Sequence, residues 1–457
     1  MLDEAFIKRM SDLLGDELSD FIAALESGLS VKAARVNTLK ASPDTYLAVA
    51  ETSLTPIAYA PDAYVLADAG GIGNTAAHHA GMIYVQDPGA MATAAAIDPQ
   101  EDWCVLDMCA APGGKSGQVA AKITKGFLLA NEYVPKRAKI LVSNLERLGV
   151  KNAVVTSLDT KEFKKLYREF FDLVIADVPC SGEGMFRKSE EAVKEWSEEN
   201  VNTCAIRQAE IIENAAPLIK CGGYLLYSTC TFSLEENEMI VDAFLERHPD
   251  FDLVPVRDEV VRHTADGIVF EGAHSEKLSL ARRFYPHRSP GEGQFLALLR
   301  RNDGDPPKKT VLFEDTAKGL GRDEQAAISD LFKKNLAEKP NGRVVKIGEN
   351  LVIISHGYPI PPRSVFSAGV LLGTVEKGIL HPAHQFFSAY GDLFLRAEEL
   401  KVGDERITKY LHGEEIEARD ASDGGYCAVK YEGATIGGGK VSLGRIKNHY
   451  PKGLRNN

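Results

Sequence analysis

Apolar residues near the start of the chain are spaced like one face of a helix. Between residues 6 and 25 they recur at steps of three and four positions, the spacing at which side chains line up along a helix. These residues are Phe6, Ile7, Met10, Leu13, Leu14, Leu18, Phe21, Ile22 and Leu25. The pattern predicts an amphipathic helix over residues 6–25 whose apolar face is buried.

After this helix the pattern changes to short apolar runs. Two β-like runs at residues 35–39 and 63–66, interrupted by prolines, predict a small α+β lobe. From about residue 80 to residue 302 such runs alternate with helical stretches, as in βαβ units on a mostly parallel sheet. The expected strands are residues 104–108, 126–130, 153–156, 172–176 and 223–228, with a sixth run, 294–299, closing the sheet at an edge. This predicts an α/β fold with a Rossmann-like, doubly wound sheet.

A polar stretch at residues 300–309, rich in charge and in Gly and Pro, is the clearest linker. Beyond it, short β-like runs and glycine-rich turns, with one helical stretch at 323–336, predict small β-rich modules. The length of 457 residues also suggests about three domains rather than one. The expected division is an N-terminal lobe (1–79), an α/β domain (80–302), a linker (303–310) and two C-terminal modules (311–395 and 396–457).

Composition narrows the protein class. With 44% hydrophobic and 26% charged residues, the chain should fold rather than stay disordered. No apolar stretch approaches the ~18 residues that cross a bilayer, and the acidic start does not fit a signal peptide, so we expect a cytoplasmic protein. The net charge of −12 weighs against nucleic-acid binding unless positive charge is concentrated locally.

Nothing in the sequence predicts a metal site. The seven cysteines contain no C-x-x-C pair and do not suggest a disulfide scaffold. His78 and His79 are adjacent on one segment and do not make a ligand set. Each cysteine is therefore a small buried hydrophobe or a reactive thiol.

A cofactor loop is expected after the first strand of the α/β domain. This strand ends in Asp107, and the loop that follows contains Gly113 and Gly114 just before a helical run. Paired glycines there let a ligand approach the backbone at a helix N-terminus. Glu132 lies about 20 residues further on, at the end of the second strand, where an acid can accept hydrogen bonds from the hydroxyl groups of a ribose. Asp159, after the third strand, could accept a hydrogen bond from an adenine amino group. The loop and acids together predict an adenosine pocket.

Two alternatives stay open for this loop. The glycines could form a plain turn beside solvated acids. Gly114, Lys115 and Ser116 also match the end of a P-loop, which would make the protein an ATPase. Against the P-loop, Cys109 stands where its first glycine should be, and Pro112 lacks a backbone N–H to cradle phosphate.

Two thiols follow neighbouring strands. Cys180 comes after the fourth expected strand and Cys230 after the fifth, so both should face one cleft at the carboxyl edge of the sheet. Buried, inert thiols are the alternative. One reaction that would use an adenosine-bearing cofactor, two thiols and a carboxylate is methyl transfer to carbon 5 of cytosine. Carbon 5 alone is too poor a nucleophile, but a thiolate that adds to carbon 6 makes it reactive enough to accept a methyl group. A carboxyl group placed near N3 of the cytosine ring, the role expected for Asp177, would favour this addition by hydrogen bonding or protonation. A second thiol would help remove the proton from carbon 5.

Three segments closely resemble motifs of the NOL1/NOP2/Sun family of RNA 5-methylcytosine methyltransferases. They are DMCAAPGGK (107–115), DVPCSGEG (177–184) and YSTCT (227–231), with further matches at RVNTL (35–39), YVQD (84–87) and PHRSPGEG (286–293). The resemblance covers about residues 1 to 300. It implies an S-adenosylmethionine-dependent enzyme with Cys230 as nucleophile and Cys180 assisting product release. Because DNA enzymes of the same chemistry use a Pro-Cys nucleophile, Cys180 remains the alternative nucleophile.

The resemblance also implies cofactor contacts and a substrate. The implied cofactor residues are Cys109, Ala110, Ala111, Pro112, Gly113, Gly114, Lys115, Glu132, Asp159 and Asp177. The C-terminal half, with GVLLG (369–373) and GRIKNHYPKGLR (444–455), resembles the RsmF-type branch, which modifies bacterial small-subunit (16S) ribosomal RNA. This implies an RsmF-type module at 311–395 and a PUA-like RNA-binding module at 396–457. One departure is Gly89-Ala90 after Asp87, where the family pattern leads us to expect Ser.

Local basic residues are the candidates for RNA contact. Residues 439–457 carry five cations and no acid, and further cations lie near the expected cleft. The predicted RNA contacts are Arg187, Lys188, Arg282, Arg283, Arg288, Lys440, Arg445, Lys447, Lys452 and Arg455. The target cytosine must leave its stack to meet Cys230. An RNA-binding assembly factor without catalysis is the non-enzymatic alternative.

Overall fold

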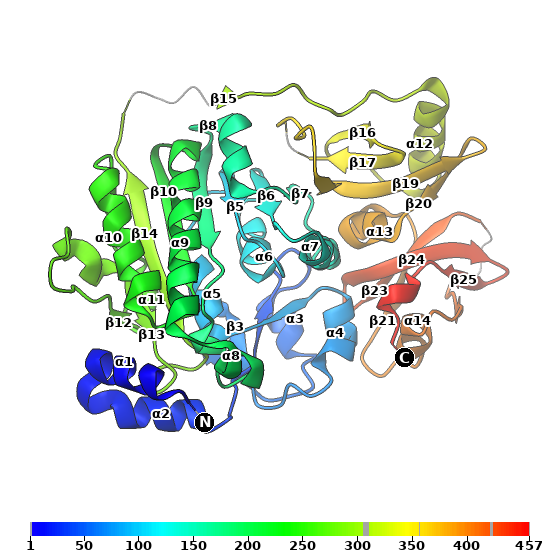
Figure 1. The fold of residues 1–457 in the computed structure, drawn as a ribbon. Coiled ribbons are helices and arrows are strands. Elements are labelled where there is room, and N and C mark those ends of the chain that lie inside the picture. The colour runs from blue at the N-terminus through cyan, green and yellow to red at the C-terminus, as the bar shows by residue number, and fades with distance from the viewer. Residues whose placement is uncertain (1, 305–309, 356, 421–423, 457) are drawn as a thin grey trace.

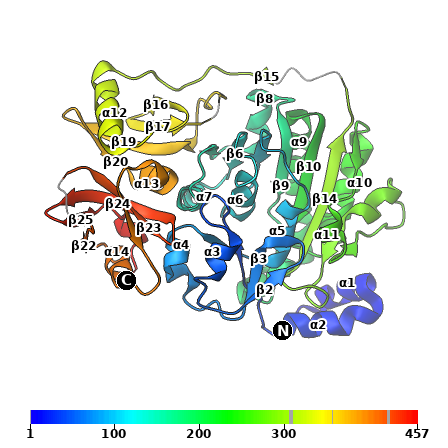
Figure 2. The same ribbon diagram turned by 180° about the vertical axis from the view of Figure 1, so that it is seen from behind.

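The computed structural model describes residues 2–304, 310–355, 357–420 and 424–456. A central α/β domain lies between two short N-terminal helices at one side and two β-rich units from the C-terminal half at the other (Figure 1). The view from behind shows the N-terminal lobe lying below the central domain and reaching toward the C-terminal sheets (Figure 2). The α/β fold class and the β-rich C-terminal sheets agree with the sequence. The residues 305–309 of the expected linker lie outside the described residues.

The central sheet has ten strands, with the order β12-β13-β14-β10-β9-β5-β6-β7-β18 and β11 also paired with β14. The five strands from β10 to β7 are parallel, as predicted. Strands β5, β6 and β7 are buried at every position, because helices and loops cover both faces of the sheet. The bounds are β5 Cys104–Asp107, β6 Phe127–Asn131, β7 Ala153–Thr156, β9 Phe171–Asp177, β10 Ile219–Thr229, β11 Phe251–Leu253, β12 Ala265–Asp266, β13 Arg282–Phe284, β14 Gln294–Arg301 and β18 Val365–Ala368.

Alternate residues of the parallel strands contribute to two separate cores. Leu106, Val174 and Tyr227 belong to one cluster, while their neighbours Val105 and Leu173 belong to the other. This follows from the alternation of side chains between the two faces of a strand. The helices of this domain are α5 Pro88–Ala95, α6 Gly114–Ala120, α7 Pro135–Arg147, α8 Glu190–Glu195, α9 Glu198–Ala215, α10 Glu238–Arg247 and α11 Asp258–Val261.

The prediction that residues 294–299 close the sheet is wrong. Strand β14 pairs with β10 on one side and with β13 and β11 on the other. Strands β12 and β13 are two and three residues long, too short for an apolar alternation to reveal them. At the opposite edge, β18 from the expected C-terminal module pairs antiparallel with β7. The central sheet therefore takes a strand from beyond the linker.

The prediction of one continuous helix over residues 6–25 is wrong, because the structure has two helices there. Helix α1 (Glu4–Leu14) ends at Gly15, whose φ of +52° is a conformation that glycine adopts readily, and α2 (Leu18–Glu26) follows a 3-10 turn. The break lets both halves turn their aromatic residues inward. Phe6 packs against Trp196, with ring centroids 5.6 Å apart, and Phe21 packs against Phe232 at 5.0 Å.

The N-terminal lobe is a four-stranded sheet with two short helices, an α+β unit as predicted. Its last strand pairs with its first, so the sheet continues past residue 79, where we expected the lobe to end. Asp87 then caps α5 by accepting from the backbone N–H of Gly89 (2.9 Å), and the departure at residues 89–90 leaves this helix start intact. The elements are β1 Ala33–Val36, α3 Pro43–Leu47, β2 Leu54–Ile57, β3 Ala60–Leu66, α4 Ala76–His79 and β4 Ile83–Gln86.

The C-terminal half contains a four-stranded and a five-stranded sheet. The first comprises β16 Arg343–Ile347, β17 Asn350–Ile354, β19 Val370–Glu376 and β20 Ile379–Pro382, with α12 Arg322–Asn335 and α13 His384–Tyr390. The second comprises β21 Ala397–Leu400, β22 Ile416–Glu417, β23 Tyr426–Tyr431, β24 Ala434–Ser442 and β25 Arg445–Asn448, with α14 Arg406–Leu411. A further short pair joins β8 Tyr167–Arg168 to β15 Thr310–Val311.

Polar contacts join these sheets to the rest of the protein. Nε2 of Gln385 on α13 donates to Glu146 on α7 at 3.0 Å. His79 of the N-terminal lobe makes hydrogen bonds to Tyr450 Oη (2.6 Å) and Asn456 Oδ1 (2.8 Å). Its two ring nitrogens are therefore engaged in holding the lobe to the C-terminal sheet. Across the described residues, no helix is both long and apolar enough to span a membrane.

Candidate active site

A cleft of about 1340 Å³ opens at the carboxyl ends of the five parallel strands. In open α/β sheets this edge is where ligands bind, because the loops after neighbouring strands converge there. Each strand contributes at least one polar or sulfur-bearing side chain, and these are Cys109 after β5, Glu132 after β6, Asp159 after β7, Asp177 and Cys180 at the end of β9, and Cys230 after β10.

Two acids lie at one end of the cleft. The carboxylate of Glu132 is almost fully buried and accepts a hydrogen bond from the Val134 backbone N–H (2.9 Å). Asp159 is more exposed and forms an ion pair with Lys161 (2.8 Å). Both line the cleft with carboxylate oxygens from successive strand ends, as expected for a site that receives hydroxyl and amino donors.

The loop after β5 is only partly at the cleft. Cys109 and Ala111 line it, whereas the remaining loop residues predicted to bind a cofactor are not among its lining residues. A Cβ on Gly114 would lie 2.9 Å from Gln86 Cδ, so this glycine allows the loop to pack against the N-terminal lobe. Gly113, with φ of +113°, makes the turn into α6. Both glycines therefore serve the packing and the turn of this loop, and close approach of a ligand to its backbone stays a prediction.

The P-loop alternative does not hold. Ser116 Oγ, which would coordinate magnesium in a P-loop, is buried and donates to Asp107 Oδ2 at 2.6 Å. Lys115 Nζ, which would reach a phosphate, forms an ion pair with Asp177 Oδ2 at 2.8 Å. Both side chains are engaged by carboxylates at the ends of β5 and β9.

The two thiols face each other, which confirms that they share one cleft. Strands β9 and β10 are parallel neighbours with Asp177 opposite Ser228, and their loops bring Cys180 Sγ to 3.1 Å from Cys230 Sγ. The Cys230 backbone N–H also points at Cys180 Sγ, at 3.3 Å. The hydrogen bond with Cys230 and burial raise the pKa of Cys180 well above that of a free thiol. Cys180 is therefore protonated at neutral pH.

Comparison with known proteins gives the same picture over the whole chain. Residues 94–300 match the family model described as 16S rRNA methyltransferase RsmB/F, residues 2–88 the N-terminal domain of RsmF, and residues 397–456 the methyltransferase RsmF PUA domain. Ribosomal RNA small subunit methyltransferase F of Vibrio vulnificus is 33% identical over 475 residues, covering 99% of this chain and 97% of the relative. The chain belongs to the RsmF family of 16S rRNA methyltransferases. This confirms the resemblance to the NOL1/NOP2/Sun family.

Further relatives agree with this RsmF membership. The methyltransferase F of Erwinia tasmaniensis is 37% identical, with 98% of this chain and 96% of the relative covered. A solved methyltransferase homologue from Pyrococcus horikoshii has a TM-score of 0.56 at 27% identity, covering 65% of this chain and 95% of that structure. The structure of NSun6 from the same organism with SFG has a TM-score of 0.56 at 22% identity, over 66% and 99%, and shows the same fold.

This RsmF-family protein is an S-adenosylmethionine-dependent methyltransferase with a C-terminal PUA domain. The cleft suits that cofactor by the chemistry of its lining: acceptor oxygens from Glu132 and Asp159 at one end, and the two thiols at the other. In such a site the acids would hold the adenosine.

Asp177 is fixed between a hydroxyl and an ammonium. Its Oδ1 accepts from Ser228 Oγ at 2.6 Å and its Oδ2 pairs with Lys115 Nζ at 2.8 Å. Burial opposes the charged form of Lys115, but the Asp177 carboxylate outweighs it and raises the pKa of Lys115 above its usual value. The carboxyl group is thus held at the rim of the cleft beside the thiols.

Buried Glu183 holds the loop that carries Cys230. It follows Cys180 by three residues and is fully buried. Its oxygens accept from the Phe232 backbone N–H (2.8 Å), Thr231 Oγ1 (2.8 Å) and Ser233 Oγ (2.6 Å). An acid in the Cys180 loop therefore binds three residues that directly follow Cys230.

A second buried acid makes the reciprocal contact. Glu236, six residues after Cys230, accepts from the Ser181 backbone N–H (2.9 Å) and from Gln208 Nε2 (2.8 Å). Burial raises the pKa of Glu236. The sequence analysis missed both acids, because neither strand periodicity nor charge pattern marks a buried carboxylate in a loop. The one signal available was Glu183 itself, inside the DVPCSGEG segment.

Three predicted RNA contacts are corrected by the structure. Arg187, Arg282 and Arg283 have side-chain exposures of 6%, 7% and 2%. Each forms an ion pair with a carboxylate that is distant in sequence: Glu292, Asp266 and Glu238 respectively. Buried charges are stable only with such partners. These arginines therefore join separate segments of the chain and are not available to phosphate.

The other predicted RNA contacts lie nearer the surface. Lys188 is partly exposed and pairs with Asp87 (3.1 Å), and Arg288 is 45% exposed and pairs with Glu17. At the C-terminal end, the Arg455 guanidinium donates to the Tyr450 carbonyl oxygen (3.2 Å). Four exposed cations remain there, namely Lys440, Arg445, Lys447 and Lys452. Within the described part of the chain, no group of three or more metal-ligating side chains occurs.

Proposed function

We propose that this protein methylates carbon 5 of a cytosine in small-subunit (16S) ribosomal RNA through a transient bond between the base and Cys230. The observation that carries the proposal is the pair of thiols, with Sγ atoms 3.1 Å apart, in a cleft that also contains Glu132 and Asp159. The relatives named ribosomal RNA small subunit methyltransferase F support the substrate class. Such a substrate places the reaction in the cytoplasm.

The first step is addition of sulfur to the base. The Cys230 thiolate forms a bond to carbon 6, and the electron pair of the carbon 5–carbon 6 double bond shifts into the ring. Ring N3 takes up a proton in this step. The Asp177 carboxyl, held between Ser228 and Lys115, can relay that proton from the Lys115 ammonium. Carbon 5 is then an enamine carbon and a competent nucleophile.

The second half of the reaction needs a base. S-adenosylmethionine, when bound, would supply the electrophilic methyl group that carbon 5 accepts. The Cys180 thiol first releases its proton to solvent, and the resulting thiolate takes the proton from carbon 5. The double bond re-forms, the Cys230 sulfur leaves carbon 6, and ring N3 returns its proton through Asp177 to Lys115. In the free enzyme the hydrogen bond to Cys230 raises the pKa of Cys180. Once the Cys230 sulfur is bonded to carbon, that contact is lost and Cys180 ionises more easily.

Glu132 is proposed to bind the cofactor ribose. In the variant Glu132→Gln we expect the Kd for S-adenosylmethionine to rise about tenfold, because a hydrogen bond to a charged acceptor contributes roughly 1.5–3 kcal/mol. Isothermal titration calorimetry measures this directly. The matched control is Glu210→Gln, an exposed acid of α9 that lines the same cleft. An unchanged Kd in Glu132→Gln would place the ribose elsewhere.

Bisulfite sequencing of 16S ribosomal RNA tests the proposed reaction. RNA from cells that contain the gene should retain at least one cytosine that resists conversion, and this cytosine should convert fully when the gene is deleted. A plasmid copy of the wild-type gene should restore the protection. If the two cell lines have identical conversion patterns in 16S RNA, the proposed substrate is wrong.

A further inference from the structure

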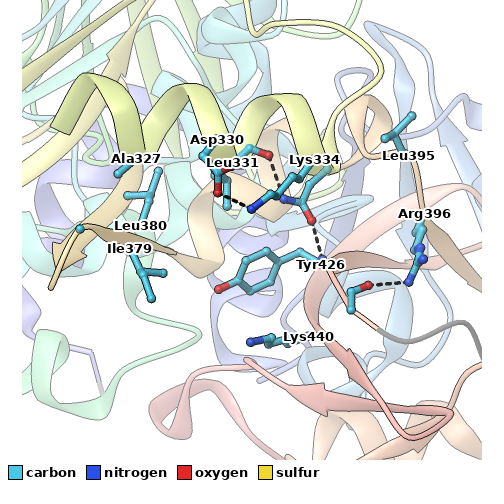
Figure 3. A pocket seen from close by; sticks show the side chains of 14 residues that line it. Ala327, Asp330, Leu331, Lys334, Ile379, Leu380, Leu395, Arg396, Tyr426 and Lys440 are labelled. Atoms are coloured by element: carbon cyan, nitrogen blue, oxygen red, sulfur yellow. Dashed lines mark hydrogen bonds and ion pairs between the residues drawn. The ribbon is translucent and has the colours of Figure 1, made fainter. Parts of the chain in front are cut away.

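A second hollow, of about 490 Å³, lies where α12 meets the last sheet. Helix α12 forms one wall with Leu331 and Lys334, the start of β20 contributes Ile379, and the last sheet contributes Tyr426 and Lys440 (Figure 3). The hollow shares no lining residue with the methyltransferase cleft. It is bounded by both C-terminal sheets, so its shape depends on how they pack together.

We propose that this hollow binds one nucleotide of a single-stranded RNA segment. The inference rests on the proposed function, since it assumes an RNA substrate, and it assigns part of that substrate to a site on this chain. The volume lies within the roughly 300–1,000 Å³ of pockets that bind small ligands. Single-stranded RNA is held mainly by stacking of bases on aromatic rings and by cations that contact phosphate.

Tyr426 provides the stacking surface. Its ring projects into the middle of the hollow, between Ile379 and Lys440 (Figure 3). Behind it, the ring of His449 lies edge-on, with centroids 5.8 Å apart, and the Tyr426 backbone N–H donates to Asn335 Oδ1 at 2.6 Å. The Phe387 ring, with centroids 6.1 Å away, is a second ring contact. The two ring contacts restrict the Tyr426 side chain and the hydrogen bond holds its backbone, so a base can stack with little further ordering.

The apolar wall is unusually exposed. Ile379 and Leu395 each have 60% of their surface open to solvent, although both border the hollow. Large aliphatic side chains gathered around a concave site mark a binding surface more often than isolated ones do. A base stacked on Tyr426 would cover Ile379 and remove apolar area from water, whereas Leu395 borders the hollow on the side of Arg396 (Figure 3).

The charge of the hollow matches RNA. Its lining contains three cations, Lys334, Arg396 and Lys440, and one acid, Asp330, which pairs with Lys334 at 2.8 Å. Lys440 lies directly across from Tyr426 in the strand pairing, where its ammonium can reach the phosphate of a stacked base. On its other side it is paired with Lys447 of β25, which is also exposed and extends the positive strip. The chain as a whole carries a charge of −12, so this concentration of cations favours a polyanion over a protein partner.

Binding at this hollow would anchor RNA away from the reacting base. The hollow contains none of the thiols or acids of the methyltransferase cleft. We therefore expect it to affect KM for RNA and to leave both kcat and the Kd for S-adenosylmethionine unchanged. This separation distinguishes an RNA-binding site from a merely structural defect.

The test uses the full chain with Ile379→Ser and Lys440→Gln combined, since both side chains are exposed. Fluorescence anisotropy with single-stranded 16S fragments should show about tenfold weaker binding, and the salt dependence of log K should fall by about one unit, as expected when one phosphate contact is lost. The control is Leu312→Ser with Lys318→Gln. Lys318 bridges to β16, the edge of the four-stranded sheet opposite β20, and the control should bind like wild type.

A second pair of variants separates stacking from folding. Tyr426→Ala should weaken RNA binding by about tenfold, whereas Tyr426→Phe keeps the ring and should restore it. The melting temperature of each variant shows whether a loss reflects unfolding. The binding assay needs no methylation, so a protein that fails to methylate 16S RNA but binds it through this hollow would overturn only the proposed function.

Two outcomes would overturn the inference itself. One is unchanged affinity and salt dependence in the Ile379→Ser/Lys440→Gln variant, or the same loss in its control. The other is normal binding of naked RNA together with weakened binding of assembled small subunits, which would assign the hollow to a ribosomal protein instead.

Discussion

Replacing Cys230 by alanine should reduce methyl transfer by at least about 10⁴-fold, the scale of losing the nucleophile of a covalent mechanism. Without that sulfur, carbon 5 of cytosine is too weak a nucleophile to take the methyl group. Transfer of tritiated methyl from S-adenosylmethionine to 16S RNA measures the loss. The Kd for S-adenosylmethionine should stay within about twofold of wild type, because the acids that would bind adenosine lie at the other end of the cleft.

The control for this experiment is Cys221→Ala. Cys221 lies near the start of β10, the strand whose other end leads into Cys230. It is also a free, partly buried thiol. This variant should keep wild-type activity. If Cys230→Ala remains active while Cys180→Ala is inactive and forms no adduct, the nucleophile is Cys180, the alternative raised by the DNA enzymes.

Cys180→Ala should accumulate RNA that is covalently attached to the protein. Addition and methyl transfer proceed, but no sulfur lies 3.1 Å from Cys230 to take the carbon 5 proton, so the bond from Cys230 to carbon 6 persists. With S-adenosylmethionine and substrate RNA, a denaturing gel should show a slowly migrating protein band that nuclease treatment removes. Turnover should fall by roughly 10²–10⁴-fold, the usual contribution of a positioned general base.

The double variant Cys180→Ala/Cys230→Ala is the reference for that gel. It should form no adduct, because the sulfur that bonds to RNA is absent. A Cys180→Ala enzyme that turns over normally and gives no slow band would contradict the assigned role of Cys180. In that case another group at the cleft removes the proton.

The sequence predicted the parallel core of the sheet and the meeting of the two thiols. The reason is that fully buried parallel strands appear as uninterrupted apolar runs, as Val105–Leu106 and Val174–Ile175 do. Loops after adjacent strands then have to converge at one edge. The position of Cys180 beside Cys230 thus followed from strand order alone.

Features that depend on tertiary contacts were missed or wrong. Arg283 looks like a surface cation in sequence, yet its partner Glu238 is 45 residues away and both are buried. No local pattern reports such a pair. The interruption at Gly15 was missed because the apolar spacing continues across it. The division of the chain into five parts remains a prediction, and the extra strands at both sheet edges show why boundaries are hard to read from composition.

The strand from beyond the linker has a consequence for any shortened version of this enzyme. If the chain ended at residue 302, β7 would lose its partner β18 and its outer row of backbone N–H and C=O groups would face water. Such an open rim invites pairing with another molecule, which is a common route to aggregation. The C-terminal half thus covers the edge of the sheet that carries the active site. The two regions should be kept together when the enzyme is produced or redesigned.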